Sequence, residues 1–191
     1  MNTDKLLLKA KEGTITDQEI QQVVSALKQQ NDKYDKYTLI HIIGRSFKSE
    51  YEPLVASYLH SPEDPMLARI ALISLCDYFG KTEKYLVDVL QFINGVHWDD
   101  EEDVRLVAIS AVGEFLRRQD QKDKFVLTLL IDIFDNSQES EIIKGCVYSA
   151  LGRAYGLDWN ELPLASQTLD FDKDINHEIL EQVKNDISAR D

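Results

Sequence analysis

Five consecutive acidic residues follow a tryptophan and precede an apolar pattern with helical spacing. The acids are Asp99, Asp100, Glu101, Glu102 and Asp103, and the tryptophan is Trp98. Carboxylates at this density could bind Ca²⁺ or Mg²⁺ or supply a catalytic acid and base. They could also attract a basic protein or stabilise the start of a helix through its dipole. These four uses make different demands on the neighbouring residues.

The metal and catalytic uses fit this stretch poorly. A calcium loop alternates its ligands and carries a glycine for its sharp turn, and the run from Asp99 to Asp103 has neither. Catalytic carboxylates need burial that separates their pKa values, and a solvated acidic run does not supply it. We therefore expect no metal, no cofactor and no catalytic residue here.

A helix start explains one or two of these acids but not five. Trp98 adds an apolar anchor beside the charges, which is the composition of a protein-binding hot spot. Trp159 offers a second instance, because Asp158 and Glu161 stand next to it. The alternatives are that the acids form only solvated loops and that each tryptophan covers one end of the core. Both interpretations remain open from the sequence.

Other reactive side chains are isolated along the chain. The histidines at positions 41, 60, 97 and 177 form no zinc-binding spacing, and no glycine-rich phosphate loop or GxSxG occurs. Cys76 and Cys146 lie seventy residues apart within apolar helical patterns. We expect both thiols to be buried and reduced.

The elements that must position these residues are helices. The spacing of apolar residues is helical almost throughout, and no strand-like alternation with hairpin turns appears. Thr16 and Glu19 predict a capping box at the start of the first long helix. Asn94-Gly95 predicts a helix end, after which the five acids fall in a loop and in the first turn of the next helix.

The helices repeat along the chain. Four segments share the order aliphatic, small, charged, any residue, then a large apolar residue. They are IGRSF at 43–47, LCDYF at 75–79, VGEFL at 112–116 and LGRAY at 151–155, with their small residues spaced by 32, 37 and 39. A second helix is expected after each, at 83–90, at 123–130 and, more loosely, at 52–59.

These repeats resemble the HEAT-repeat family. The best match contains Asp64-Pro65, Leu67, Arg69 and Ala71. The next unit matches at Val104, Arg105, Ala108, Ala111 and Gly113. The resemblance implies an all-α, HEAT-like α-solenoid of four to five helix pairs within one domain, 1–191. Capping helices would occupy 1–31 and 171–191, and repeats 32–170. We expect the small residue near the end of each first helix to allow close helix packing.

Charge is distributed unevenly along the sequence. The net charge is −13, and residues 1–60 hold eight acids and eight bases, so the later part carries all of the excess. Such a surface repels nucleic acid and attracts a basic protein. No window approaches 18 apolar residues, and the N-terminus lacks a signal-peptide core, so we expect a cytoplasmic protein that does not span a membrane.

We therefore expect a non-catalytic module whose acidic surface binds a basic protein, such as an immunity protein that masks a basic toxin. The resemblance places second helices on the concave face, where further contacts would come from Asp88, Gln91, Asp132 and Asp135. One alternative is an enzyme or small-molecule binder that uses the concave groove, like the lyase-like or glycosylase-like HEAT relatives. Another is a structural subunit of a larger assembly.

Overall fold

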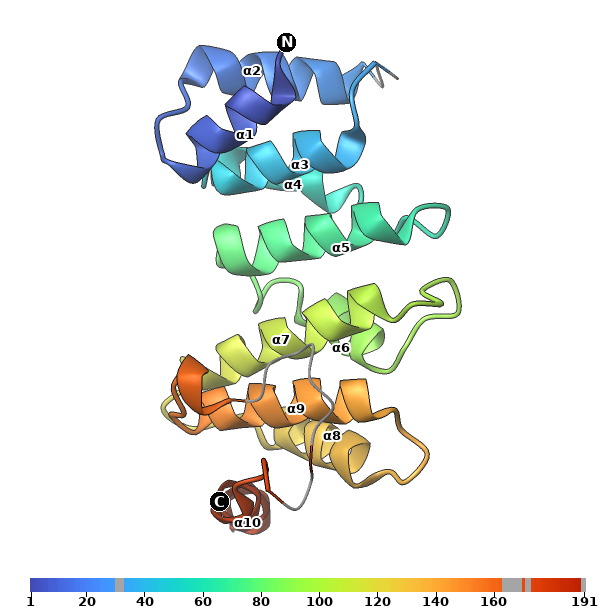
Figure 1. Cartoon of the computed structure of the whole chain (residues 1–191), viewed down its shortest axis with the longest axis vertical. Coiled ribbons are helices and arrows are strands. Elements are labelled where there is room, and N and C mark those ends of the chain that lie inside the picture. Colours follow the sequence, from blue (N-terminus) through green and yellow to red (C-terminus); the bar gives the residue numbers. More distant parts are fainter. Residues whose placement is uncertain (30–32, 163–169, 171–172, 190–191) are drawn as a thin grey trace. The chain divides into compact units, whose positions relative to one another are not determined.

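The computed structural model describes the chain except for residues 30–32, 163–169, 171–172 and 190–191. Its described residues form helices and no strands (Figure 1). The α-helices are α1 (Thr3–Lys11), α2 (Asp17–Lys28), α3 (Lys36–Arg45), α4 (Glu52–Ala56), α5 (Pro65–Ile73), α6 (Leu86–Ile93), α7 (Asp103–Arg117), α8 (Lys124–Asp135), α9 (Glu141–Ala154) and α10 (His177–Ser188). Short 3₁₀ turns occupy η1 (Ser49–Tyr51) and η3 (Trp159–Glu161), and η2 (Ser74–Tyr78) is a π-helical turn. The expected all-α class is confirmed.

The chain divides into two compact units, residues 1–107 and 108–191, with the boundary inside α7. In the first unit α3 is the central helix and packs against α1 and α2 and also against α5 (Figure 1). Its apolar face is fully buried at Leu39, Ile40 and Ile43. These residues recur at the i, i+1, i+4 spacing that places side chains on one side of a helix.

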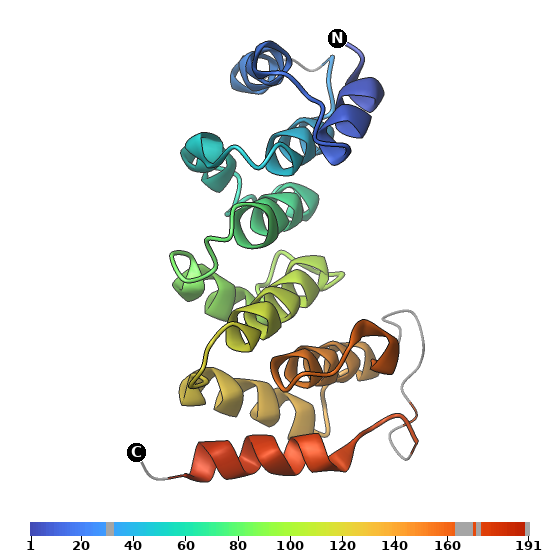
Figure 2. The ribbon, with the colours of Figure 1, turned by 90° about the vertical axis from the view of Figure 1, so that its left-hand side faces the viewer.

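In the second unit α8 contacts both α9 and α10 (Figure 2). Leu127 and Leu130 from α8 and Val147 from α9 are fully buried. Tyr148 is also buried, and its hydroxyl accepts a hydrogen bond of 2.8 Å from the backbone N–H of Asn176, just before α10 begins. The expected C-terminal helix is present as α10.

Helix ends follow the signals in the sequence. The capping box is confirmed, because Thr16 Oγ accepts from the Glu19 N–H and the Glu19 carboxylate accepts from the Thr16 N–H. Asn94 caps the end of α6, and Gly95 follows with φ of +84°, a left-handed conformation that favours glycine. The second helix expected from residue 83 begins only at Leu86, because Lys81 to Tyr85 form a hydrogen-bonded turn.

The expected close packing at small residues is confirmed in both units. A Cβ added at Gly44 would meet the side chain of Ser74 and would lie 2.7 Å from Tyr78 Cδ2. A Cβ added at Gly113 would lie 2.7 Å from the backbone Cα of Ala150. Side chains larger than hydrogen at these positions would force neighbouring segments apart.

Neither cysteine forms a disulfide with another described residue, and Cys76 is buried while Cys146 is partly buried. Burial raises the pKa of Cys76 to about 12 and that of Cys146 to about 11. Within the described residues, no helix combines the length and the apolar character needed to cross a bilayer.

Candidate functional site

The acidic run lies in a loop between α6 and α7 of the first unit. The Asn94 amide donates a hydrogen bond of 2.8 Å to the carbonyl of Leu90, which closes the last turn of α6. Helix α7 begins at Asp103, the last of the five acids. The loop is therefore anchored by a helix end on each side, as the sequence predicted.

Asp99 is a buried helix cap. Its side chain is 6% exposed, and Oδ2 accepts hydrogen bonds from the backbone N–H groups of Val104 (2.9 Å) and Arg105 (3.1 Å). These groups belong to the first turn of α7 and have no partner within the helix. Asp99 is thus the member of the run least suited to contact a partner directly, since its carboxylate is already used inside the molecule.

The last two acids of the run, Glu102 and Asp103, form ion pairs. Glu102 accepts a hydrogen bond of 2.6 Å from Nη1 of Arg105, whose Nε also donates to the carbonyl of Ile93 (2.9 Å). Asp103 Oδ1 lies 3.5 Å from Nε of Arg69 on α5. Nearby guanidinium groups therefore compensate much of the charge of both carboxylates.

Asp100 and Glu101 remain for an external partner. Both are exposed, and neither side chain makes a hydrogen bond or ion pair within the described part of the chain. Trp98 is partly buried, with its ring edge-on to Phe92 at a centroid distance of 6.0 Å. The loop thus presents one anchored indole and two uncompensated carboxylates. A hollow of 290 Å³ beside them is lined by residues that include His97 and Arg105.

The second predicted pair of acids lies in the other unit. Asp158 and Glu161 are exposed, and the Asp158 N–H donates a hydrogen bond of 2.7 Å to Glu161 Oε2 across η3. The Trp159 side chain lies outside the described residues. The prediction that these residues form a second contact remains open.

The four contact residues predicted on the second helices have different surroundings. Asp88 pairs with His60 at 2.7 Å, and Asp135 pairs with Lys184 at 2.9 Å. Gln91 and Asp132 are exposed, and no hydrogen bond of either side chain occurs in the described residues. These four contacts stay predictions.

One polar cluster was missed by the sequence analysis. Glu52 is 8% exposed, and its carboxylate accepts a hydrogen bond of 2.6 Å from the Tyr85 hydroxyl and pairs with Lys84. Lys84 and then Tyr85 hold the pKa of Glu52 below its usual value. The buried carboxylate connects α4 to the turn before α6. Because its partners are 32 and 33 positions away in the sequence, no local sequence pattern could predict this contact.

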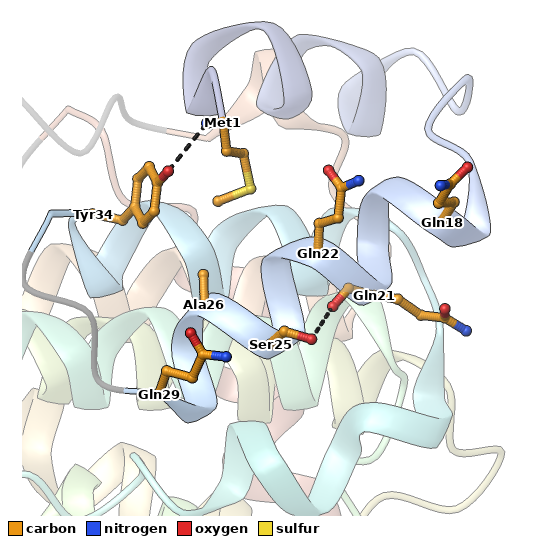
Figure 3. Close-up of a pocket in the computed structure, with 8 residues that line it drawn as sticks. All are labelled: Met1, Gln18, Gln21, Gln22, Ser25, Ala26, Gln29 and Tyr34. Carbon is orange, nitrogen blue, oxygen red and sulfur yellow. Dashed lines mark hydrogen bonds between the residues drawn. The ribbon is translucent and has the colours of Figure 1, made fainter.

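Two larger pockets lie elsewhere. The first, of 540 Å³, lies along α2 and is lined by Gln18, Gln21, Gln22 and Gln29, with Tyr34 accepting a hydrogen bond of 3.1 Å from the amino group of Met1 (Figure 3). Its lining is suited to hydrogen bonding of polar groups rather than to proton transfer.

The second pocket, of 770 Å³, lies in residues 117–189 and is lined by charged groups that include Lys122 and Asp186. Tyr155 donates a hydrogen bond of 2.8 Å to Asp186, and burial followed by this bond raises the pKa of Tyr155. The Lys122 ammonium lies 5.6 Å from the centre of the Tyr155 ring. In the described residues, no group of three or more His, Cys, Asp or Glu side chains is placed to hold a metal ion.

Comparison with known proteins found no matching family, no similar curated protein and no similar solved structure.

Proposed function

We propose that this chain is a non-catalytic protein-binding module that recognises a basic partner through the loop between α6 and α7. The observation that carries the proposal is the combination of Trp98 with Asp100 and Glu101, the two acids of the run that pair with no cation among the residues the structure describes. The other three acids of the run are used to cap α7 or to pair with arginines. A loop held by such contacts loses little freedom on binding.

Charge and the aromatic anchor would have different roles in this recognition. The net charge of −13 produces a long-range field that accelerates encounter with a basic protein, and salt screens this field. Trp98 would then act at short range. Truncating a buried aromatic hot spot weakens binding by about 2 kcal/mol or more, which corresponds to about 30-fold in affinity.

For the scaffold, we favour stacked HEAT-like helix pairs. Support comes from α3, which packs against the α1–α2 pair and against α5, and from the close approach at Gly44 and Gly113. Each pair has an apolar face that it cannot bury alone, so neighbouring pairs complete the core. A small acidic binder of this kind would suit the inhibition of a basic toxin, as an immunity protein does.

The test measures association with a synthetic 15-residue peptide of alternating Lys, Arg and Leu, and with a neutral version in which Gln replaces the cations. The Trp159→Phe variant leaves Trp98 as the only tryptophan, so its fluorescence reports binding at the loop. We expect the basic peptide to bind and its association rate to fall steeply between 20 and 500 mM salt.

Two charge-matched double variants separate local contact from net charge. Asp100→Asn with Glu101→Gln should weaken binding at least fivefold. Glu178→Gln with Glu181→Gln removes two exposed charges on α10 and should change binding less than twofold. An association rate independent of salt, or equal losses in the two double variants, contradicts the proposal.

A second candidate function follows from the 770 Å³ pocket, whose volume suits a small molecule. Its lining holds three cations, Arg117, Lys122 and Lys124, against two acids, Asp120 and Asp186, which favours a ligand with an anionic group. Thermal shifts measured with a panel of small carboxylates and phosphates, and lost in Lys122→Ala, would support this function.

A further inference from the structure

Phe47 has an unusual combination of conformation and exposure. Its φ is +55°, in the left-handed region that bulky residues rarely adopt, and its side chain is 61% exposed. In the matching positions of two other repeat segments, Phe79 is 9% exposed and Leu116 is fully buried. The first segment therefore exposes an aromatic side chain at a position that two of the three equivalent segments bury and that the third, with Tyr155, partly buries.

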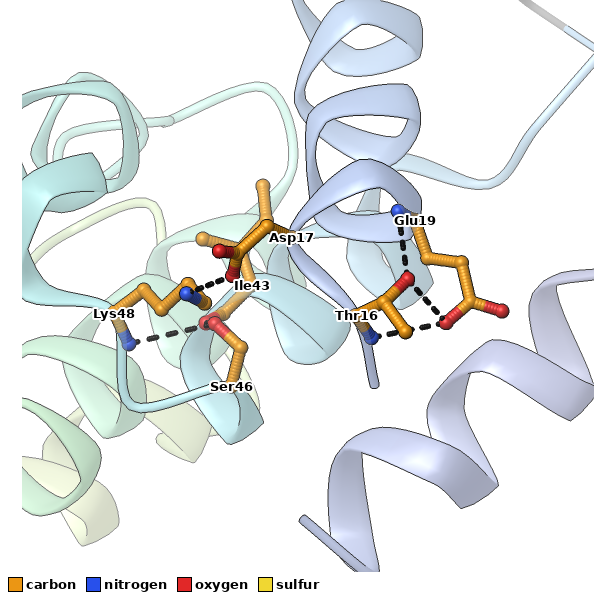
Figure 4. A network of polar contacts seen from close by, with 6 residues as sticks. All are labelled: Thr16, Asp17, Glu19, Ile43, Ser46 and Lys48. Carbon is orange, nitrogen blue, oxygen red and sulfur yellow. Dashed lines mark hydrogen bonds and ion pairs between the residues drawn. The ribbon is translucent and has the colours of Figure 1, made fainter. Parts of the chain in front are cut away.

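The residues on either side hold Phe47 in this conformation (Figure 4). Ser46 Oγ donates a hydrogen bond of 2.6 Å to the carbonyl of Ile43 and accepts one of 3.4 Å from the Lys48 N–H. The Phe47 N–H donates to the carbonyl of Gly44 at 3.0 Å, and the Lys48 ammonium pairs with Asp17 on α2. A strained backbone persists where its surroundings fix it, and such residues are concentrated at binding sites.

Phe47 belongs to a cluster of aromatic and cationic side chains. Its ring is edge-on to Tyr78 at a centroid distance of 5.8 Å, and the Arg45 guanidinium lies 4.5 Å from the centre of the Tyr78 ring. On α3, Tyr37, His41 and Arg45 recur every four residues and so share one side of the helix. His41 stacks parallel to Tyr78, with an interplanar angle of 5° and centroids 6.2 Å apart.

Two backbone features, the π-helical turn η2 and a glycine in α3, position Tyr78 within this cluster. Tyr78 ends the π-helical turn η2, a conformation that occurs frequently at functional sites. Glycine at position 44 allows Tyr78 to approach α3 closely, since an added Cβ would lie 2.7 Å from the Tyr78 ring. Arg45 at the end of α3, Phe47 in the turn that follows α3, and Tyr78 in η2 are thus brought together.

Arg45 is the cation of this cluster, and the exposed carboxylate of Asp77, which directly precedes Tyr78, also acts electrostatically on Tyr78. No carboxylate forms an ion pair with Arg45 in the described residues, and its buried Nε has no hydrogen-bond partner. Arg69 donates to the Tyr37 hydroxyl at 3.3 Å and forms an ion pair with Asp103 at 3.5 Å, so Arg45 is the cation left for a partner. Burial, followed by the charges of Arg45, Lys11 and Arg69, lowers the pKa of His41, which indicates a positive local potential.

We infer that Arg45, Phe47 and Tyr78 form a docking site for an acidic peptide segment of a partner protein. A carboxylate of the segment pairs with the Arg45 guanidinium, whose planar shape suits it. An adjacent apolar side chain packs on Phe47 and on the exposed edge of the cluster. This site is opposite in charge to the Trp98 loop and does not depend on the function proposed for that loop.

An acidic peptide fits better than the alternatives. Nucleic acid would also offer anions and aromatic rings, but the net charge of −13 opposes the approach of a phosphate backbone. A peptide bears fewer charges than a nucleic acid and contacts Arg45 directly, and salt screens the repulsion from acids farther away than about 10 Å.

The test uses fluorescence anisotropy of a labelled 12-residue peptide of alternating Asp, Glu, Leu and Phe, compared with a neutral peptide in which Asn and Gln replace the acids. We expect the acidic peptide to bind at least tenfold more tightly. Phe47→Gly should reduce its affinity at least tenfold while leaving the unfolding midpoint unchanged or raised, because glycine adopts φ of +55° without strain. Arg45→Gln should cause a similar loss.

A control variant and control ligands test whether binding depends on this site and on the charge of the peptide. Phe125→Ala removes another exposed phenylalanine, on α8, and should change the affinity less than twofold. The inference is overturned if Phe47→Gly binds like the unmodified protein, or if the neutral peptide or a single-stranded oligonucleotide binds as tightly as the acidic peptide. It is also overturned if Phe47→Gly abolishes a concentration-dependent self-association, because the site would then join two copies of this chain.

Discussion

Two glycines inside helices should respond in opposite ways to the same substitution. Gly113 lies in α7 and Gly145 in α9, and neither has a positive φ. Replacement by alanine removes conformational freedom from the unfolded chain and improves helix propensity by about 1 kcal/mol at either position. The surroundings of the new methyl group determine the remainder of the effect.

At Gly113 the methyl group would lie 2.7 Å from both Cα and Cβ of Ala150, whereas ordinary contacts begin at 3.4 Å. The obstacle is partly backbone, so no rotation of a side chain can relieve it and α7 must move away from α9. Overpacking of this kind destabilises by about 1–3 kcal/mol, which exceeds or cancels the helix gain. At Gly145 no heavy atom lies within 4 Å, so only the gain remains.

Thermal unfolding followed by circular dichroism measures the difference. For a chain of this length, 1 kcal/mol corresponds to about 2–4 °C in Tm. We expect Gly145→Ala to raise Tm by about 3 °C and Gly113→Ala to lower it by up to about 6 °C. If Gly113→Ala raised Tm as much as Gly145→Ala, α7 and α9 would not pack as closely as the structure has them.

Three further predictions concern single side chains. Asp99→Ala leaves the buried N–H of Val104 and the partly buried N–H of Arg105 without their acceptor and should destabilise by about 1–3 kcal/mol in urea unfolding. Asp100→Ala should stay within about 0.5 kcal/mol, and equal effects would contradict the assignment of Asp99 as the cap. A hydrogen bond from Lys9 holds the pKa of Glu19 near 2, against 4.5 normally, so the stability that Glu19 provides is complete above pH 4.5 and is lost as the pH falls towards 2. The stability difference between the unmodified protein and Glu19→Gln should therefore shrink over that pH range, and a constant difference would refute the pairing. Because burial raises the pKa of Cys76 to about 12, Ellman's reagent should not react with Cys76 at pH 8 until urea unfolds the chain, and rapid labelling of this thiol in the folded protein would refute its burial.

The amino-acid sequence by itself determined the helices and most of their ends. Apolar spacing, the Thr16–Glu19 capping box and the Asn94-Gly95 stop are local signals, because each depends on residues only a few positions apart. The close packing at Gly113 was also foreseen, since the repeat pattern places small residues at equivalent positions. Periodicity could not show that α6 begins at Leu86, because the preceding turn has the same apolar pattern.

Only the tertiary structure decided which surface groups remain for a partner. Asp99, Asp100 and Asp103 look alike in the sequence, but Asp99 caps α7 and Asp103 pairs with Arg69, a residue of a different helix. Asp100 is exposed and has no partner in the part of the chain that the structure describes. Phe47 matches a pattern in which Phe79 and Leu116 are buried and Tyr155 is partly buried, yet Phe47 itself is exposed, with a left-handed φ just after α3. Exposure and charge compensation depend on residues distant in the sequence, and therefore no local pattern contains them.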